Sequence, residues 1–591
     1  MNDWNLKVLY EGFDDEAFKK DFAKLDEMIT SMKTLSEWIT SDNTQVVEKL
    51  ERYLAKTEEI GSLVSQLGHF AMLTLSVEST HAEASKYRDG IFQKTSQLTE
   101  SESEIDLWIG KIEKIDDVIA SSEILKTHAF YLKEIIRNQK YMLSPKEESI
   151  VAQMQNTGST AWSSYKDKLI ATHTVKVVVD GETKVMPLTE VLNLSSSSSK
   201  AQRKAAYEAE VQSYARIEEG VVAALNAIKG EALTVVELRG YKSPLHMTLE
   251  NSRMSEKTLE AMLEAMRESM PAFRKYLQRK AELLGYKKGL PWYELYAPVV
   301  EKEMPFDYEA GKAFVVKQFG TFSEQLANFA QHAMDNDWID VYPKAGKVGG
   351  AFCAGIKPLK ESRILLNYGD TLGDVITMAH ELGHGFHNYC MNDETDLNSS
   401  YPMPLAETAS TLCETIVKKA AVKAADAEEK IAIIENELSD CTQVIVDIYS
   451  RYLFETAFFE KRKEGFVSVE ETKALMLEAQ KEAYGEGMDE SLLHPYMWTW
   501  KSHYYNANNN FYNFPYAFGL LFAKGLYAKY EEDTQNFPKR YEELLAVTGK
   551  MSIEDVAGSI GIDVTEKAFW ENSLRTIIED IDKFMSLTEQ K

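Results

Sequence analysis

Cysteine, proline and glycine are all scarce in this chain of 591 residues. The chain has 14 prolines and 30 glycines, where average usage gives roughly 30 and 41. Both residues interrupt helices, so their scarcity over so long a chain predicts long helices. Four cysteines are too few for a disulfide framework, and we expect them to be buried apolar side chains. They are Cys353, Cys390, Cys413 and Cys441.

Positively charged residues are fewer than negatively charged ones. Lysine and arginine total 66 against 93 aspartates and glutamates, which gives a formal net charge of −27. Nucleic acids and anionic membrane surfaces bind basic faces, so the composition argues against both as partners. The sequence has neither an uninterrupted apolar run of about 18 residues nor a basic leader followed by an apolar core. We therefore expect no membrane span and no secretory signal, and predict a cytoplasmic protein.

The apolar residues that are present repeat at helical spacing. From residue 18 to residue 39 they recur every three or four positions, which predicts one helix with an apolar stripe. Similar stripes continue to about residue 170 and predict an antiparallel helical lobe. The stripe consists of Phe18, Phe22, Leu25, Met28, Ile29, Met32, Leu35, Trp38 and Ile39.

Two β elements interrupt this helical pattern. The run "THTVKVVVDGETKVMPL" alternates and offers a turn at Asp180-Gly181, which predicts a hairpin at about 172–188. Further on, "GKVGGAFCAGIKPLKESRILLNY" predicts two short strands, near 348–356 and 362–368. The rest of the chain reads as helix, apart from the unusual stretch "HYYNANNNFYNFPYAFG". The sequence thus predicts a mainly α protein with a small β element.

A domain boundary is expected near the serine-rich stretch at 195–199. We predict an N-terminal helical lobe with the hairpin at 1–195 and a second domain at 196–591. Ser199 is expected to cap the long helix that begins the second domain.

The segment "DVITMAHELGHGFHNYC" contains the strongest motif in the chain. Its "HELGH" fits the HExxH pattern with His380, Glu381 and His384, for which the chance of a coincidental match is about 0.03 in this composition. Thr371 and Asp374 have the spacing of a helix-capping box. On a helix, His380 and His384 share a face and can bind one Zn²⁺, and Glu381 can act as general base on a bound water.

Three further residues extend this site. A catalytic zinc needs a third protein ligand, and Glu407 in the predicted helix "YPMPLAETASTLCETIVKKAA" is the candidate, because its neighbours are apolar. Glu414 lies seven positions later and can hydrogen-bond a ligand histidine. His387 is too far along the helix axis to share a metal with His380. It is expected either near the metal or the substrate, or packed in the core.

The residues around the motif resemble those of a known family. "HELGHGFH" and "PLAETASTLCE", preceded by "GAFCAG…RILLNYGDTLGDVITMA", resemble oligoendopeptidase F, among the thimet-oligopeptidase-like zinc metallopeptidases. The resemblance implies a two-lobed helical body with a deep channel, one zinc ion per chain and cytoplasmic action on short unfolded peptides. It assigns His380, His384 and Glu407 to the zinc and catalysis to Glu381.

The resemblance also implies residues that bind the substrate. The strand "GGAFC", with Gly350, Ala351 and Phe352, resembles the edge strand that pairs with a peptide backbone. The aromatic stretch resembles a loop that faces the metal. There, His503, Tyr512 and Tyr516 are implied to stabilise the oxyanion and Tyr505 to bind substrate, with simple packing as an alternative for Tyr505.

Two other functions stay open at this point. An HExxH protein can be an aminopeptidase or a carboxypeptidase instead of an endopeptidase. A peptide-binding protein that keeps zinc only for structure is a second alternative, although such sites are closed by four protein ligands.

Overall fold

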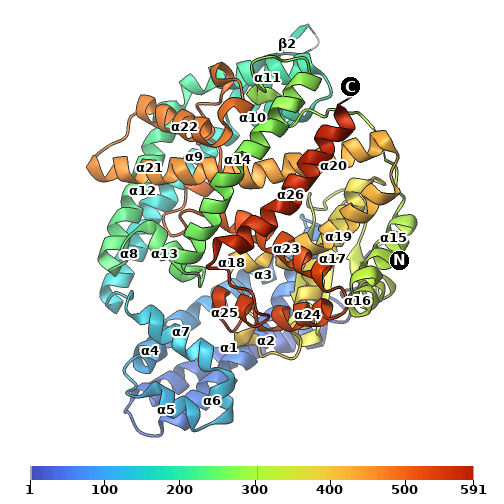
Figure 1. Cartoon of the computed structure of the whole chain (residues 1–591). Coiled ribbons are helices and arrows are strands. Elements are labelled where there is room, and N and C mark those ends of the chain that lie inside the picture. Colours follow the sequence, from blue (N-terminus) through green and yellow to red (C-terminus); the bar gives the residue numbers. More distant parts are fainter. Residues whose placement is uncertain (1–2, 180, 303, 590–591) are drawn as a thin grey trace.

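The computed structural model describes residues 3–179, 181–302 and 304–589. It is 71% helix and 5% strand, which confirms the mainly α fold expected from the scarcity of proline and glycine. Figure 1 shows the first helices gathered at one end of the molecule, while α14 and α26 run side by side across the larger body.

Nine helices are described before the hairpin. The first, α1, carries the predicted apolar stripe on its buried face, begins at the Asp15 cap and packs against α2. They are α1 (Glu16–Thr40), α2 (Val46–Val77), α3 (Ala82–Thr95), α4 (Thr99–Ile109), α5 (Ile115–Ala120), α6 (Glu123–Thr127), α7 (Ala129–Gln139), α8 (Pro145–Thr157) and α9 (Ser159–Ala171).

The second helix is long and apolar enough to span a membrane by length and composition. Core helices of soluble proteins meet the same criteria. Leu50, Leu54, Leu67 and Phe70 of α2 are buried in the N-terminal core, together with residues of α1. This face of the helix is therefore already covered by protein.

The predicted hairpin is confirmed. Strands β1 (Thr174–Val179) and β2 (Glu182–Pro187) pair antiparallel, with Thr174 opposite Pro187. Gly181 has the positive φ that such turns require, while Asp180 lies outside the described residues. The alternate valines of β1 are buried in the core of the larger body. The domain division at residue 195 stays a prediction.

The larger body consists of the remaining helices around a second, continuous core. Ser199 caps α11 as expected, because its side chain accepts from the Gln202 amide. The helices are α10 (Leu188–Asn193), α11 (Lys200–Ser213), α12 (Glu218–Arg239), α13 (Pro244–Asn251), α14 (Glu256–Leu283), α15 (Tyr308–Phe322), α16 (Glu324–Asp335), α17 (Leu372–Cys390), α18 (Met403–Ala406), α19 (Thr408–Ala424), α20 (Ala427–Thr442), α21 (Ile448–Glu464), α22 (Val469–Tyr484), α23 (Phe514–Glu532), α24 (Phe537–Val547), α25 (Ile553–Gly558) and α26 (Lys567–Thr588).

A small sheet lies against α17. Its strand order is β3 (Ile339–Asp340), β5 (Glu361–Leu365), β4 (Phe352–Ile356), with β4 antiparallel to β5. The two predicted strands are confirmed with slightly different ends, and β3 is additional. Within the described residues, β4 pairs on one side only, so its other edge can accept a further strand.

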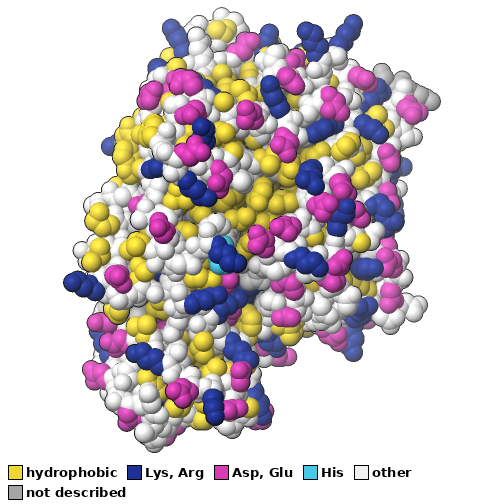
Figure 2. Space-filling view, turned by 60° about the vertical axis from the view of Figure 1, so that its left-hand side comes forward, with side chains coloured by type: hydrophobic (Ala, Val, Ile, Leu, Met, Phe, Trp, Pro, Cys, Tyr) yellow, Lys and Arg dark blue, Asp and Glu magenta, His cyan; other side chains and the backbone are white. Residues whose placement is uncertain are grey.

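One face of the molecule is markedly apolar. In the space-filling view, hydrophobic side chains gather in the middle of this face, with most acidic and basic side chains around them (Figure 2). Apolar areas with a charged rim are typical of surfaces that bind other molecules.

Candidate metal centre and substrate cavity

The HExxH motif lies on a well-capped helix. The Thr371 amide donates to the Asp374 carboxylate at 3.0 Å, and the Asp374 amide donates to the Thr371 hydroxyl at 3.3 Å. This is the predicted capping box, and α17 continues from it through the whole motif. His380 and His384 consequently lie one turn apart on the same face.

Glu407 lies at a break between two helices. The sequence predicted one continuous helix here, but α18 ends at Ala406 and α19 begins at Thr408. The Ser410 hydroxyl contacts the Glu407 carbonyl at 3.1 Å and its carboxylate at 2.8 Å. Such side-chain bonds compete with the helical pattern, and this one also holds the Glu407 side chain in place.

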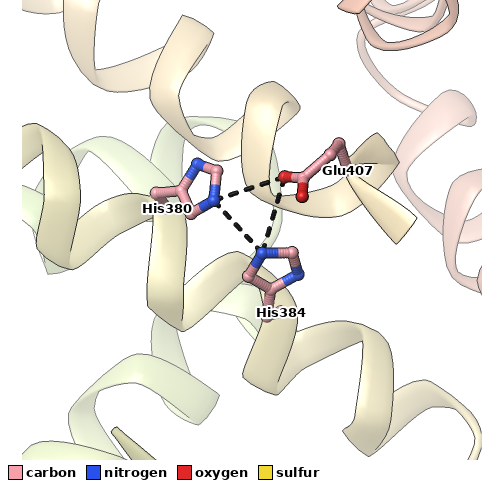
Figure 3. A group of neighbouring side chains, drawn as sticks. All are labelled: His380, His384 and Glu407. Carbon is pink, nitrogen blue, oxygen red and sulfur yellow. Dashed lines mark hydrogen bonds and ion pairs between the residues drawn. The ribbon is translucent and has the colours of Figure 1, made fainter. Parts of the chain in front are cut away.

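The three predicted ligands converge on one point (Figure 3). The Nε2 atom of His380 lies 3.3 Å from Oε2 of Glu407, and the Nε2 atom of His384 lies 3.6 Å from the same oxygen. The two Nε2 atoms are 3.1 Å apart. Two imidazoles and a carboxylate with all ligand atoms within 4.8 Å of one another form a donor set that suits Zn²⁺.

Glu414 fixes the orientation of one of these rings. Its Oε1 atom lies 2.5 Å from Nδ1 of His380, on the opposite side of the ring from Glu407. A carboxylate on Nδ1 keeps a proton there, so a metal ion would be bound through Nε2.

Burial and hydrogen bonds together set the pKa values of the charged groups in the site. Burial disfavours a cation on His380, but bonds to Glu407 and Glu414 outweigh this effect and raise its pKa to about 10. Burial raises the pKa of Glu381 to about 7, against the opposing effect of His380. The Oε2 atom of Glu381 is buried without a hydrogen-bond partner among the described residues. Such an oxygen is ready to take a proton from a small molecule.

Glycines allow the helices to approach the site closely. A Cβ atom on Gly383 would lie 2.6 Å from the Ser410 Cα, and one on Gly519 would lie 2.9 Å from the Glu407 Cβ. The α17–α19 and α19–α23 crossings therefore depend on having glycine, which has no side chain, at positions 383 and 519. The crossing at Gly383 agrees with the expectation that another element passes close to its backbone.

A cavity of about 590 Å³ connects the site with the sheet edge. Its lining includes Gly350 and Ala351 just before β4, and His380 and Glu381 of α17. The Phe352 ring contacts Trp4 at 6.2 Å between centroids and belongs to a small core, so only its backbone is available for pairing. The structure thus brings the predicted edge strand beside the predicted general base.

The aromatic residues implied for the oxyanion form a second group. The ring of Tyr512 stacks on that of His503 at 5.6 Å, and Tyr516 meets both edge-on. Tyr516 was expected on a loop, but it lies in the first turn of α23, which begins at Phe514 and has the favourable Pro515 in its first turn. It lines a cavity of about 310 Å³ together with Glu407.

Tyr505 and His387 are buried and make contacts inside the protein. The Tyr505 hydroxyl donates to the Trp498 carbonyl at 2.8 Å, and the side chain is buried, as in the packing alternative. His387 is fully buried, contacts the Thr548 hydroxyl at 2.8 Å and stacks on Tyr401 at 4.2 Å. These three contacts support structural roles for Tyr505 and His387.

Sequence reasoning missed Lys418, which lies 3.0 Å from Glu414. Its four-residue spacing from Glu414 was the available signal, since such pairs meet on a helix. Gly519 was missed as well, and its contact with Glu407 has no local signal.

A helical body with two imidazoles and a carboxylate around one point, beside a buried glutamate, is the architecture of a metallopeptidase. The profile described as "Peptidase family M3" matches residues 193–576, and the profile described as "Oligopeptidase F" matches residues 111–174. The chain belongs to peptidase family M3, whose members are metallopeptidases. This confirms the family resemblance seen in the sequence.

Relatives named as oligopeptidases match almost the whole chain. Oligopeptidase PepF of Bacillus subtilis is 22% identical over 597 residues, which cover 99% of this chain and 87% of the relative. The oligoendopeptidase F homolog of Borreliella burgdorferi is 25% identical, and the alignment covers 95% of this chain and 96% of the relative.

Solved structures share the fold. A putative peptidase from Chlamydophila abortus superposes with a TM-score of 0.87 at 22% identity, covering 99% of this chain and 98% of the other. Oligoendopeptidase-F from Enterococcus faecium gives a TM-score of 0.71 at 16% identity, covering 98% and 99%. The mainly helical architecture is therefore that of oligoendopeptidase F structures.

Proposed function

We propose that this protein is a zinc-dependent endopeptidase that hydrolyses short unfolded oligopeptides in the cytoplasm. The observation that carries the proposal is the convergence of His380, His384 and Glu407 beside a buried, partnerless oxygen of Glu381. Relatives named oligopeptidase and oligoendopeptidase, which match nearly the whole chain, support the substrate class.

His380, His384 and Glu407 are the residues that would hold the zinc ion. When bound, zinc would act as a Lewis acid that activates water and polarises the scissile carbonyl. A set of three protein ligands would suit a catalytic zinc, which also binds water, better than a structural zinc held by four protein ligands.

Glu381 is the proposed general base. Its partnerless Oε2 atom accepts a proton from the attacking water and later delivers it to the leaving amine nitrogen. A carboxylate whose pKa is raised by burial to about 7 both accepts and releases protons near neutral pH.

We assign substrate orientation to two groups on different sides of the site, the edge of β4 and the aromatic residues around Tyr516. The free edge of β4 pairs with the peptide backbone, which positions an extended chain across Glu381. On the side of Glu407, the hydroxyl of Tyr516 is the leading donor to the developing oxyanion, with Tyr512 and His503 beside it.

The variant Glu381→Gln tests the general base directly. A fluorescence-quenched peptide blocked at both ends serves as substrate, because only an endopeptidase cleaves it internally. We expect zinc content to be retained and kcat to fall by about 10²–10⁴-fold, the usual contribution of general acid–base catalysis. Undiminished cleavage by the variant would exclude the role of Glu381, and no cleavage of the blocked peptide by the wild type would favour an aminopeptidase, a carboxypeptidase or a binding protein.

Glu542→Gln is a matched control. Glu542 is a half-buried glutamate whose pKa burial also raises, and it accepts a hydrogen bond from Ser323 at 2.8 Å. It lies on α24 outside the two cavities described above. Its variant is expected to keep both zinc and turnover.

A further inference from the structure

Charged side chains continue from the candidate metal centre into the protein. Glu414 lies 2.5 Å from His380 and 3.0 Å from Lys418, which lies one turn further along α19. Lys418 in turn lies 2.5 Å from Glu437 of α20, and Glu437 lies 2.6 Å from Lys524 of α23. Acidic and basic groups thus alternate across helices α17, α19, α20 and α23.

Each carboxylate in this series uses a different oxygen for each neighbour. Glu414 directs Oε1 to the His380 ring and Oε2 to the Lys418 ammonium. Glu437 directs Oε2 to Lys418 and Oε1 to Lys524. Because both oxygens are engaged, neither carboxylate can rotate without losing a bond.

The ammonium of Lys418 is surrounded by acidic groups. Besides Glu414 and Glu437, Asp440 lies 3.9 Å away, and the lysine side chain is 11% exposed. An anionic substrate group would be repelled by these three carboxylates, although Lys418 borders the cavity. Its contacts are therefore directed into the protein, toward Glu414.

We propose that Lys418 is a positioning residue for the metal ligand His380, acting through Glu414; this inference rests on the proposed zinc site. The ammonium holds Oε2 of Glu414, so that Oε1 stays on Nδ1 of His380 and the Nε2 atom faces Glu407 and His384. Without it, the carboxylates of Glu414 and Glu437 would have no cation between them. Their repulsion would turn Glu414 away from the ring.

The test compares the zinc affinity of Lys418→Met with that of Lys419→Met, measured on the full-length protein by competition with a chromogenic chelator. Lys419 is the next residue of α19 and lies 3.3 Å from Asp580, so its variant also loses one ion pair. Loss of a partner outside the ligand set costs about 10–100-fold in metal affinity, and we expect about 10-fold for Lys418→Met. Lys419→Met should stay within about twofold of the wild type, because its partner is not linked to the ligands.

A double variant separates positioning from general destabilisation. If Lys418 acts through Glu414, adding Lys418→Met to Glu414→Gln should weaken zinc binding no further than Glu414→Gln alone. Additive losses, or a zinc affinity of Lys418→Met equal to that of the wild type, would overturn the inference. Should Lys418→Met not fold, Lys418→Gln, which keeps a polar side chain but lacks the charge, is compared in the same way.

The outcomes distinguish the inference from the proposed function. A wild-type protein that binds no zinc at His380 and His384 would contradict both. A wild-type protein that binds zinc and cleaves peptide, with a Lys418→Met variant that does both equally well, would contradict the role of Lys418 alone.

Discussion

At the scale of single residues, the spacing of the motif was informative because residues four apart on a helix lie on the same face. His380 and His384 had to share a face once α17 was recognised, and the capping residue Thr371 made that helix predictable. Glu407 was suggested by its apolar neighbours, and the structure brings it to the two imidazoles. Lys418 had such a signal only in its four-residue spacing from Glu414, while its contact with Glu437 could not be predicted because Glu437 comes from another helix.

Tyr516→Phe is expected to lower kcat by about 10²-fold, since removal of one oxyanion donor typically has an effect of this size. Tyr516 lines the cavity beside Glu407, and burial raises the pKa of its hydroxyl to about 12, so it stays protonated and can donate. Steady-state cleavage of the quenched peptide measures the effect. Tyr527→Phe, on the same helix, serves as control, and equal activity of the two variants would remove Tyr516 from the mechanism.

At the scale of elements, helices with regular apolar spacing were predictable and their interruptions were not. The stripe from residue 18 to residue 39 lies within α1 as expected. The break at Glu407 depends on hydrogen bonds from Ser410, which no periodic pattern contains. Strand β3 has two residues, Ile339 and Asp340, too few to show alternation, and it forms because β5 lies beside it.

Gly383→Ala should separate α17 from α19. The added methyl would lie 2.7 Å from the Ala409 carbonyl oxygen, and overpacking of this kind costs about 1–3 kcal/mol. Thermal or denaturant unfolding measures the loss, and zinc affinity should fall with it because Glu407 precedes α19.

Gly373→Ala on the same helix is the control for Gly383→Ala. There the added Cβ would meet only the Thr371 hydroxyl oxygen, at 3.4 Å, so the helix should gain about 0.5–1 kcal/mol from the loss of glycine. If both variants were equally stable, close approach at Gly383 would not limit the helix crossing.

At the scale of the whole molecule, the site lies inside the larger body. The side chains of His380, His384 and Glu407 are 25%, 20% and 28% exposed. Sequence patterns predicted the helical class, because periodicity reports burial along each helix. They do not predict how the helices pack together, so the expectation that the helices enclose a channel came only from the family resemblance.

Access to this interior site should depend on whether the substrate is folded. We expect a peptide sequence that is cleaved in a flexible tail to resist cleavage when it forms a helix within a stable carrier domain. A folded domain cannot present an extended backbone to the β4 edge. Mass spectrometry of both digests measures the difference, and denaturing the carrier should restore cleavage. Equal cleavage of the tail and the native helix would show that access to the site does not require an unfolded substrate.

The contact between Gly519 and Glu407 bears on how the enzyme is made. Residues around position 519 leave the ribosome well after those around position 407, yet α23 lies directly against the Glu407 side chain. Glu407, the proposed third ligand, therefore gains its final support only when most of the polypeptide has been synthesised. A growing chain with only the histidine-bearing helix complete would hold metal weakly, and this order of events would keep unfinished copies from degrading peptides.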